Sequence, residues 1–281
     1  MSAVENFVTK YFTPKKVAVF YTIITIAYMV SPVILPMKVS GWTLDYIAEL
    51  DKLDPGDVVV WGHNWGGIVS ARSGLTINTA IMEYLMSKQI KIIFVSFSPA
   101  TPANMYTFMH DYAKSEDYGY EYGIDWVVTP FLAGEESVIA AVGDDMWYPE
   151  VDMFGTPISE IPIYENIHVI SDAQLAMCDG GGFSWQPMYV RQWAIRHEIP
   201  MVNNYGFQVI AIYYDIYVQG VLDRTRGHAE FEYQTGFQGE EVLRFQFRNI
   251  GSALVFVSVI LGNIALYSKK KEDRDTVGVV A

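Results

Sequence analysis

Two long uncharged runs constrain the fold of this chain more than any other feature. The first extends from Val17 to Met37 and the second from Asn249 to Tyr267. A helix over either run would be roughly 30 Å long, which is about the thickness of the hydrocarbon core of a bilayer. The sequence therefore predicts two transmembrane helices, 17–37 and 249–267, and Pro32 and Pro36 are expected to kink or end the first.

Basic residues beside the two runs predict their orientation. Lys10, Lys15 and Lys16 precede the first run, and a lysine cluster at 269–271 follows the second. Because cytoplasmic flanks carry an excess of lysine and arginine, both termini are expected in the cytoplasm. The predicted organisation is a two-pass cell-membrane protein, with a cytoplasmic N-terminus (1–16), an extracytoplasmic domain (38–248) and a cytoplasmic tail (268–281).

The segment between the runs is acidic. Residues 38–248 contain 12 basic and 28 acidic residues, a formal net charge of −16. Such a field repels phosphate backbones, so nucleic acid is excluded as a partner. The single cysteine, Cys178, excludes an intrachain disulfide and a cysteine-rich zinc site.

The same segment alternates between strand and helix patterns. This alternation predicts parallel βαβ units. The expected fold class is α/β: a doubly wound, mostly parallel sheet in a Rossmann-like three-layer sandwich between two transmembrane helices. Strands are expected over 56–62, 90–97, 124–131, 167–172, 175–180 and 199–206, and helices over 78–89, 102–118, 134–146, 188–198 and most of 210–236.

Ligands of doubly wound sheets bind beyond the carboxyl ends of the strands. Residues that directly follow the predicted strands are therefore the candidates for a binding site. The predicted ligand-binding residues are His63, Asn64, Trp65, Thr129, Asp179 and Asn204.

Familiar catalytic and cofactor motifs are incomplete here. "GHNWGG" (62–67) resembles the serine-hydrolase elbow, but Asn64 stands where the nucleophile is needed, and the motif follows the first strand. Its glycines lack the spacing of a dinucleotide fingerprint, and "CDGGGFSW" (178–185) lacks the lysine of a phosphate loop. No catalytic residues and no cofactor are predicted.

Metal-ligating patterns are equally weak. His228 and Glu232 are spaced i, i+4 in "HAEFE", and Asp144 and Asp145 are adjacent. Such pairs are more typical of solvated helix faces, and no metal site is predicted.

The second apolar run contains small residues that can bring helices close together. Gly251, Ser258 and Gly262 are the candidate helix-packing positions, against the first span or another subunit.

Four stretches resemble an uncharacterised family of prokaryotic membrane proteins with a span, a Rossmann-like α/β domain and a closing span. They are "YGYEYGIDWV" (118–127), "FGTPISEIP" (154–162), "RGHAEFEYQTG" (226–236) and "VILGNI" (259–264). The resemblance implies this architecture and no particular activity.

The leading functional hypothesis is a membrane-anchored, non-catalytic subunit that serves as an assembly or interaction platform in a membrane complex. Its partners would be the lipid bilayer and other membrane subunits or further copies of the chain. Two anchors, 34 Phe and Tyr residues and the incomplete catalytic motifs support it. Two alternatives stay open: an extracytoplasmic small-ligand sensor, and an enzyme of unknown class that uses Asp145 or His63.

Overall fold

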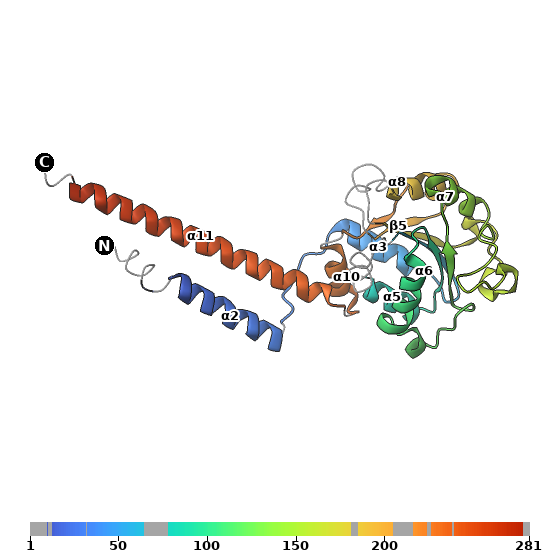
Figure 1. Ribbon diagram of the computed structural model, residues 1–281, viewed down its shortest axis with the longest axis horizontal. Coiled ribbons are helices and arrows are strands. Elements are labelled where there is room, and N and C mark those ends of the chain that lie inside the picture. Colours follow the sequence, from blue (N-terminus) through green and yellow to red (C-terminus); the bar gives the residue numbers. More distant parts are fainter. Residues whose placement is uncertain are drawn as a thin grey trace. The chain divides into compact units, whose positions relative to one another are not determined.

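The chain forms two compact units, shown in the computed structural model of Figure 1. One unit comprises Met1–Pro36 and Leu243–Ala281, and the other is Met37–Val242. The structure describes residues 10, 13–31, 33–64, 78–180, 185–204, 216–223, 226–237 and 239–277.

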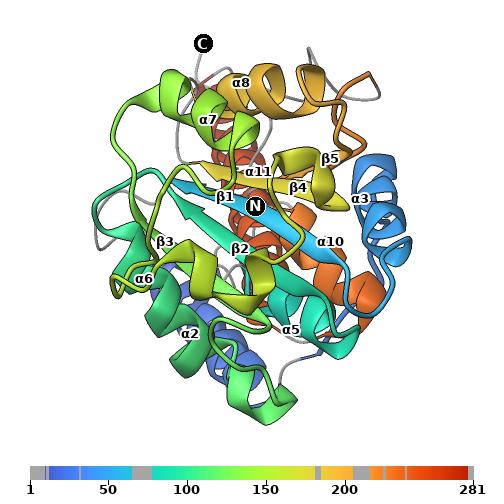
Figure 2. The same cartoon turned by 90° about the vertical axis from the view of Figure 1, so that its right-hand side faces the viewer.

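The Met37–Val242 unit is built on a six-stranded, all-parallel sheet, which confirms the predicted α/β class. Strands lie in the order β3-β2-β1-β4-β5-β6, seen along the sheet in Figure 2. From β1 the chain adds β2 and β3 on one side, then crosses back to place β4 on the other side. The strands are β1 (Val58–Asn64), β2 (Lys91–Ser96), β3 (Trp126–Phe131), β4 (Leu175–Gly180), β5 (Met201–Asn203) and β6 (Gly220–Val221).

Helices cover both faces of this sheet and complete the three layers (Figure 2). Alternation along β1 shows why: Val58 and Val60 belong to one buried cluster, and Val59 and Trp61 to the other. Successive side chains of a strand point to opposite faces, so a fully apolar strand needs helices on both. One layer contains α7 (Glu135–Asp144) and α8 (Trp185–Tyr189); the other contains α3 (Gly41–Asp51), α5 (Thr79–Ser87), α6 (Thr101–Thr107) and α10 (Gly227–Thr235).

Several predicted elements are wrong in type or length. The expected strand 167–172 contains a 3₁₀ turn, Ile170–Asp172. The helix expected over most of 210–236 includes strand β6, and its described helical part is only α10. Short apolar runs fit either period, so neighbouring strands decide between them.

Two further predicted helices are interrupted. The helix expected over 102–118 stops at Thr107 and continues as a π-helical turn, Phe108–Tyr112, and a 3₁₀ helix. Lys114 there has a φ of 49°, a left-handed conformation that no helix can continue through. The helix expected over 188–198 is split between α8 and a π-helical segment, Val190–Ile195.

Gly62 allows the central strand to lie directly beneath two aromatic rings. A Cβ at this position would lie 2.5 Å from Cε1 of Tyr189 and 2.8 Å from Cη2 of Trp193. Both rings are fully buried, so they have no space into which to move.

We predict that Gly62→Ala lowers the free energy of unfolding by about 1–3 kcal/mol, the usual cost of overpacking a core. Chemical denaturation of the detergent-solubilised protein measures it. Gly41→Ala is the matched control, because nothing lies within 4 Å of a Cβ there. Equal stability of both variants and the wild type would contradict the close approach at Gly62.

The other unit contains α2 (Pro14–Val30) and α11 (Glu241–Val277), the latter beginning at the end of the sheet-containing unit. The helix expected over 17–37 ends early: α2 stops at Val30, and Ser31 has φ −140° and ψ 79°. Proline at position 32 explains this end, because a residue before proline is disfavoured in the α region.

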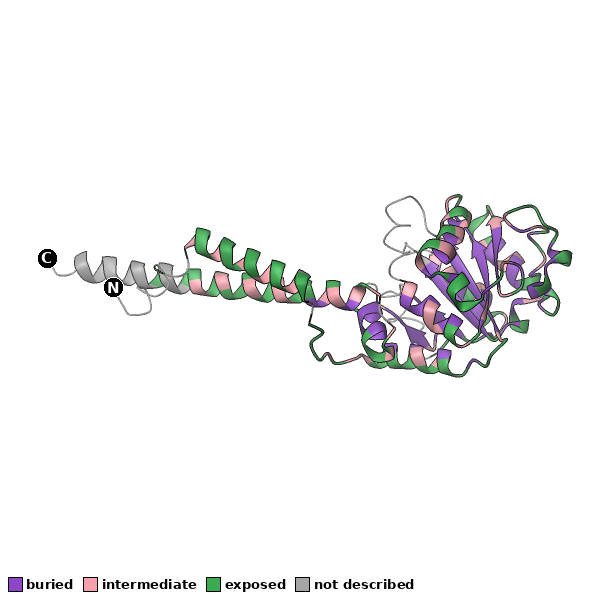
Figure 3. Cartoon of the chain, turned by 90° about the horizontal axis from the view of Figure 1, so that it is seen from below, coloured by how far each residue is buried: buried purple, intermediate pink, exposed green. Residues whose placement is uncertain are grey.

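Among the described residues, one helix is long and apolar enough to cross a membrane: α11, over Glu241–Asn263. Almost none of this window is buried within the protein, as the exposed colouring in Figure 3 shows. Its exposed apolar side chains include Val255, Phe256 and Val259. Such an exposed apolar surface is typical of a helix that packs against lipid or against another helix.

The candidate helix-packing positions lie on α11. Ser258 is partly buried, and nothing described lies within 4 Å of a Cβ at Gly251 or Gly262. Their role in helix packing stays a prediction, and it would require a partner other than the described part of α2.

The Gln246 side chain on α11 forms hydrogen bonds with the backbone of the extended segment that follows α2. Its side-chain amide accepts a hydrogen bond from the Leu35 N–H at 2.7 Å and donates one to the Leu35 carbonyl at 2.7 Å. Nearby, the Tyr28 and Phe247 rings pack 5.5 Å apart. The extended backbone at Leu35 pairs with no strand that the structure describes. The Gln246 amide therefore provides the hydrogen-bond partners that a neighbouring strand would provide.

We predict that Gln246→Leu exposes the Leu35 amide to hydrogen exchange, because leucine can neither accept nor donate a hydrogen bond. Loss of one such hydrogen bond costs about 0.5–1.5 kcal/mol. Gln246→Glu keeps the acceptor and should retain protection of the Leu35 N–H. Unchanged exchange in Gln246→Leu would show that the contact does not hold this segment.

Candidate functional site

Four polar side chains form a row at the carboxyl ends of neighbouring strands. Parallel register pairs His63 with Ser96 on β2 and with Asp179 on β4. Asn204 directly follows β5, and its N–H donates to the Cys178 carbonyl at 3.0 Å. All four are at least 95% buried. We call Ser96, His63, Asp179 and Asn204 the polar row.

Strand alternation places the polar row on the face that α3 and α5 cover. The His63 ring packs 4.8 Å from Trp61 and 5.4 Å from Phe94, both in that buried cluster. Asp179 and Asn204 each lie two residues beyond a strand residue of the same cluster, Met177 and Val202 respectively.

Two helical residues bond to this row. Asn78, which precedes α5, donates from Nδ2 to Asp179 Oδ2 at 2.6 Å. Tyr46, in the middle of α3, donates its hydroxyl to Asn204 Oδ1 at 2.5 Å. The Nδ1 atom of His63 lies 3.7 Å from Asp179 Oδ2, beyond hydrogen-bonding distance.

Asp179 gives the row a negative field. Burial raises the pKa of Tyr46 well above its ordinary value, and the Asp179 charge raises it further. The same two causes raise the pKa of the Cys178 thiol and of Tyr189. Burial lowers the pKa of His63 well below its usual value, so its imidazole is neutral at pH 7. The site therefore combines one carboxylate with neutral donors and acceptors.

Hydrogen-bonding capacity remains unused in and beside the row. Within the described residues, Asn78 Oδ1, Asn204 Nδ2 and Ser96 Oγ have no hydrogen-bond partner, although all three atoms are buried. An unsatisfied buried polar group costs about 1–3 kcal/mol.

The structure brings only some of the predicted ligand-binding residues together. It brings His63, Asp179 and Asn204 together. Asn64 is only partly buried and alternates to the opposite face of β1. Thr129 Oγ1 accepts from the Ser96 N–H at 2.9 Å and donates to the Pro130 carbonyl, so it joins β3 to β2. Trp65 lies outside the described residues.

Sequence reasoning missed Asn78, Tyr46 and Ser96. Asn78 opens the predicted helix 78–89, and asparagine before a helix was a usable signal. Ser96 is a polar residue inside a predicted apolar strand, which was also a signal. The sequence contains no signal for Tyr46, because α3 and the end of β5 come together only in the folded protein.

The residues considered for metal binding have other contacts. Asp144 pairs with Arg196 at 2.6 Å and with His197 at 3.2 Å. The Asp145 side chain accepts from the Trp147 N–H at 2.9 Å. Glu232 accepts backbone hydrogen bonds at the start of α11. Over the described ranges, no three His, Cys, Asp or Glu side chains form a group that could hold a metal ion.

Comparison with known proteins adds no assignment: no family model, no curated protein and no solved structure matches this chain. The resemblance to two-span prokaryotic membrane proteins stays a prediction from the four quoted stretches. Strand order, 3-2-1-4-5-6, is that of Rossmann sheets, whose ligands bind where the order reverses, between β1 and β4.

Two buried histidines predict a pH dependence of stability. Burial lowers the pKa of His63 strongly and that of His228 to about 3. An unfolded histidine has a pKa of about 6.5, so below that pH the unfolded state binds protons that the folded state does not. The free energy of unfolding should therefore fall as the pH falls below about 6.5, by about 2 kcal/mol per histidine between pH 7 and pH 5.

Denaturant titrations at pH 7 and pH 5 measure this loss. His63→Gln and His228→Gln should each lose less stability between the two pH values than the wild type does. Both variants keep every carboxyl group, so acid titration of those groups affects all three proteins alike. Identical losses in all three would mean that the two imidazoles are not buried as described.

Proposed function

We propose that this chain is a membrane-anchored binding protein for a small, neutral or cationic polar ligand. The observation that carries the proposal is the polar row at the β1–β4 switch point. It combines a buried carboxylate with buried amide and hydroxyl atoms that lack partners among the described residues. Folding rarely leaves such groups unsatisfied unless a water or a ligand satisfies them.

The class of ligand follows from charge. Asp179 creates a negative field that reaches Tyr46, Cys178 and Tyr189. Residues 38–248 as a whole carry a net charge of −16. Anionic ligands such as nucleotides are therefore disfavoured, while sugars, polyols, amino acids and amines offer suitable groups.

Membrane attachment is the second part of the proposal. The exposed apolar surface of α11 supports one span. For the other, α2 supplies about 26 Å of helix, and the Gln246 amide satisfies the extended backbone beyond it at Leu35. With two spans, the basic flanks favour cytoplasmic termini and an extracytoplasmic binding domain.

A thermal-shift screen of the full protein in detergent tests the binding function. We expect a sugar, polyol, amino-acid or amine to raise Tm, because a ligand at 100 times its Kd stabilises the native state by about 2.7 kcal/mol. Asp179→Asn and Asn204→Leu should abolish the shift. Asn64→Ala should retain it, because Asn64 alternates to the opposite face of β1. A folded protein that responds to none of these classes, or only to nucleotides, would contradict the proposal.

The assembly platform remains a second candidate, favoured by the unburied apolar surface of α11. Native mass spectrometry from mild detergent separates it from a solitary receptor. Recovery with other subunits or as a homo-oligomer would support the platform, and recovery as a monomer would contradict it.

A further inference from the structure

Two buried glutamates on α10 cap the starts of two other helices. Glu230 Oε2 accepts hydrogen bonds at the start of α3, from the Ser40 N–H at 3.0 Å and from Thr43 Oγ1 at 2.8 Å. Glu232 accepts from the Val242 N–H at 2.8 Å and the Glu241 N–H at 3.2 Å, at the start of α11. A carboxylate at a helix N-terminus satisfies free N–H groups and interacts favourably with the helix dipole.

These two caps lie where the chain enters and leaves the sheet-containing unit. That unit runs from Met37 to Val242, so Ser40 is near its first residue and Val242 is its last. Arg226, at the start of α10, adds a hydrogen bond to the Lys38 carbonyl at 2.5 Å and an ion pair with Glu230. One short helix therefore holds both connections to the membrane-anchoring segments.

Phe231 lies between the two glutamates and connects α10 to the polar row. Its buried ring packs edge-to-face on Tyr46, with ring centroids 6.0 Å apart. The hydroxyl of the same Tyr46 donates to Asn204 in the row. The Tyr46 side chain therefore contacts both Asn204 in the polar row and Phe231 on α10, the helix that caps α3 and α11.

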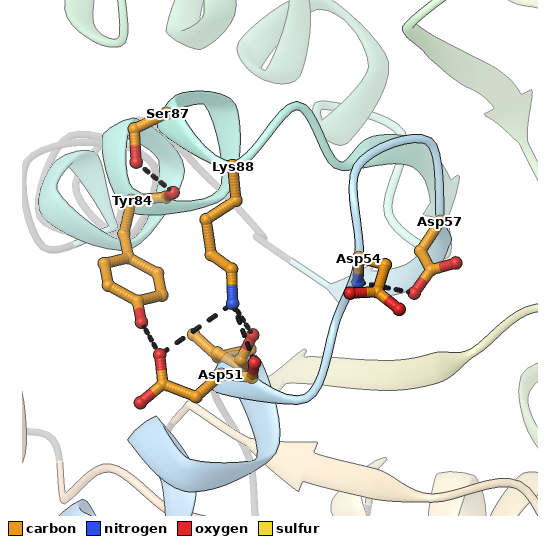
Figure 4. A network of polar contacts seen from close by, with 7 residues as sticks. Asp51, Asp54, Asp57, Tyr84, Ser87 and Lys88 are labelled. Carbon is orange, nitrogen blue, oxygen red and sulfur yellow. Dashed lines mark hydrogen bonds and ion pairs between the residues drawn. The ribbon is translucent and has the colours of Figure 1, made fainter.

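Lys88 and Tyr84 form hydrogen bonds with the C-terminal end of α3, the helix that carries Tyr46 (Figure 4). Lys88 Nζ donates to the carbonyls of Leu50 and Asp51 at 2.8 and 3.0 Å, which satisfies the C-terminus of α3. Tyr84 bonds to the Asp51 side chain, and its ring lies 5.6 Å from Phe231. Strand β6 packs directly against α3, because Gly220 on β6 has no side chain. A Cβ at Gly220 would lie only 2.2 Å from Tyr46 Cα.

We infer that the polar row is energetically coupled to both membrane connections through Tyr46 and Phe231. The inference rests on the proposed function, since it makes ligand occupancy the signal. Asn204 Nδ2 has no partner among the described residues, and a ligand that bonds to it fixes the amide with Oδ1 toward Tyr46. The bond from Tyr46 then strengthens, α3 and α10 are held together, and the caps at Ser40 and Val242 tighten. Such coupling is reciprocal, so the state of the caps also sets the affinity of the row.

Hydrogen–deuterium exchange on the full-length protein in detergent, without added ligand, tests the coupling. Tyr46→Phe keeps the ring on Phe231 but loses the hydroxyl, and Asn204→Ala removes its acceptor. Each should raise the exchange rates of the Ser40, Glu241 and Val242 amides about two- to tenfold, the range for loss of one hydrogen bond. The double variant should do no more than either single change, because both break the same bond. Glu230→Gln should in turn raise exchange over Met201–Asn203.

Tyr120→Phe is the control, because it removes a buried hydrogen bond, from the Tyr120 hydroxyl to the Ile90 carbonyl at 2.8 Å, that lies before β2 and contacts no residue of the polar row. It should leave the three cap amides at wild-type rates. Unchanged cap amides in Tyr46→Phe and Asn204→Ala, or an equal rise in Tyr120→Phe, would overturn the inference. Because no ligand is added, a failed ligand screen leaves this result standing, and a failed exchange experiment leaves the binding proposal standing.

Discussion

The parallel pairing of β1 with β4 determines what the sheet-containing unit can do. These strands are far apart in sequence, and between them the chain forms β2, β3 and the helices that cover both faces. Their register sets His63 beside Asp179 and Gly62 beside Cys178. Had β4 paired one residue out of register, Asp179 would point to the opposite face, away from Asn78. The polar row exists because this register is fixed by apolar residues on both faces.

Single side chains provide hydrogen-bond partners for backbone groups at several places outside the candidate site. Around α3 and α10, Glu230, Glu232 and Lys88 provide partners for backbone groups at three helix ends. In the unit that contains α2 and α11, Gln246 does the same for Leu35. Asn78 and Asn204 each use one end of their amide within the described residues and leave the other end without a partner. Buried polar atoms without a partner also occur elsewhere in the described residues, among them Trp126 Nε1, Tyr164 Oη and Ser115 Oγ, so the row is one of several such places.

Three residues of the site could be predicted from the sequence with a single rule about parallel sheets. Residues that follow strands of a parallel sheet gather at one edge, so His63, Asp179 and Asn204 could be named in advance. The rule cannot tell which face a side chain takes, and Asn64 was included with His63 although the two alternate. It also omits what helices contribute. Asn78 and Tyr46 reach the row from α5 and α3, and their contacts join residues more than 100 positions apart.

The sequence by itself determined the α/β class, the three central strands, and one apolar run, within α11, that is long enough to cross a membrane. Local composition is enough for these, because buried strands and membrane-length helices need long apolar stretches whatever surrounds them. Only the tertiary structure decided that 220–221 is a strand and that Glu230 and Glu232 are helix caps. Short segments and single carboxylates have several local solutions of similar free energy, and contacts with distant residues select among them.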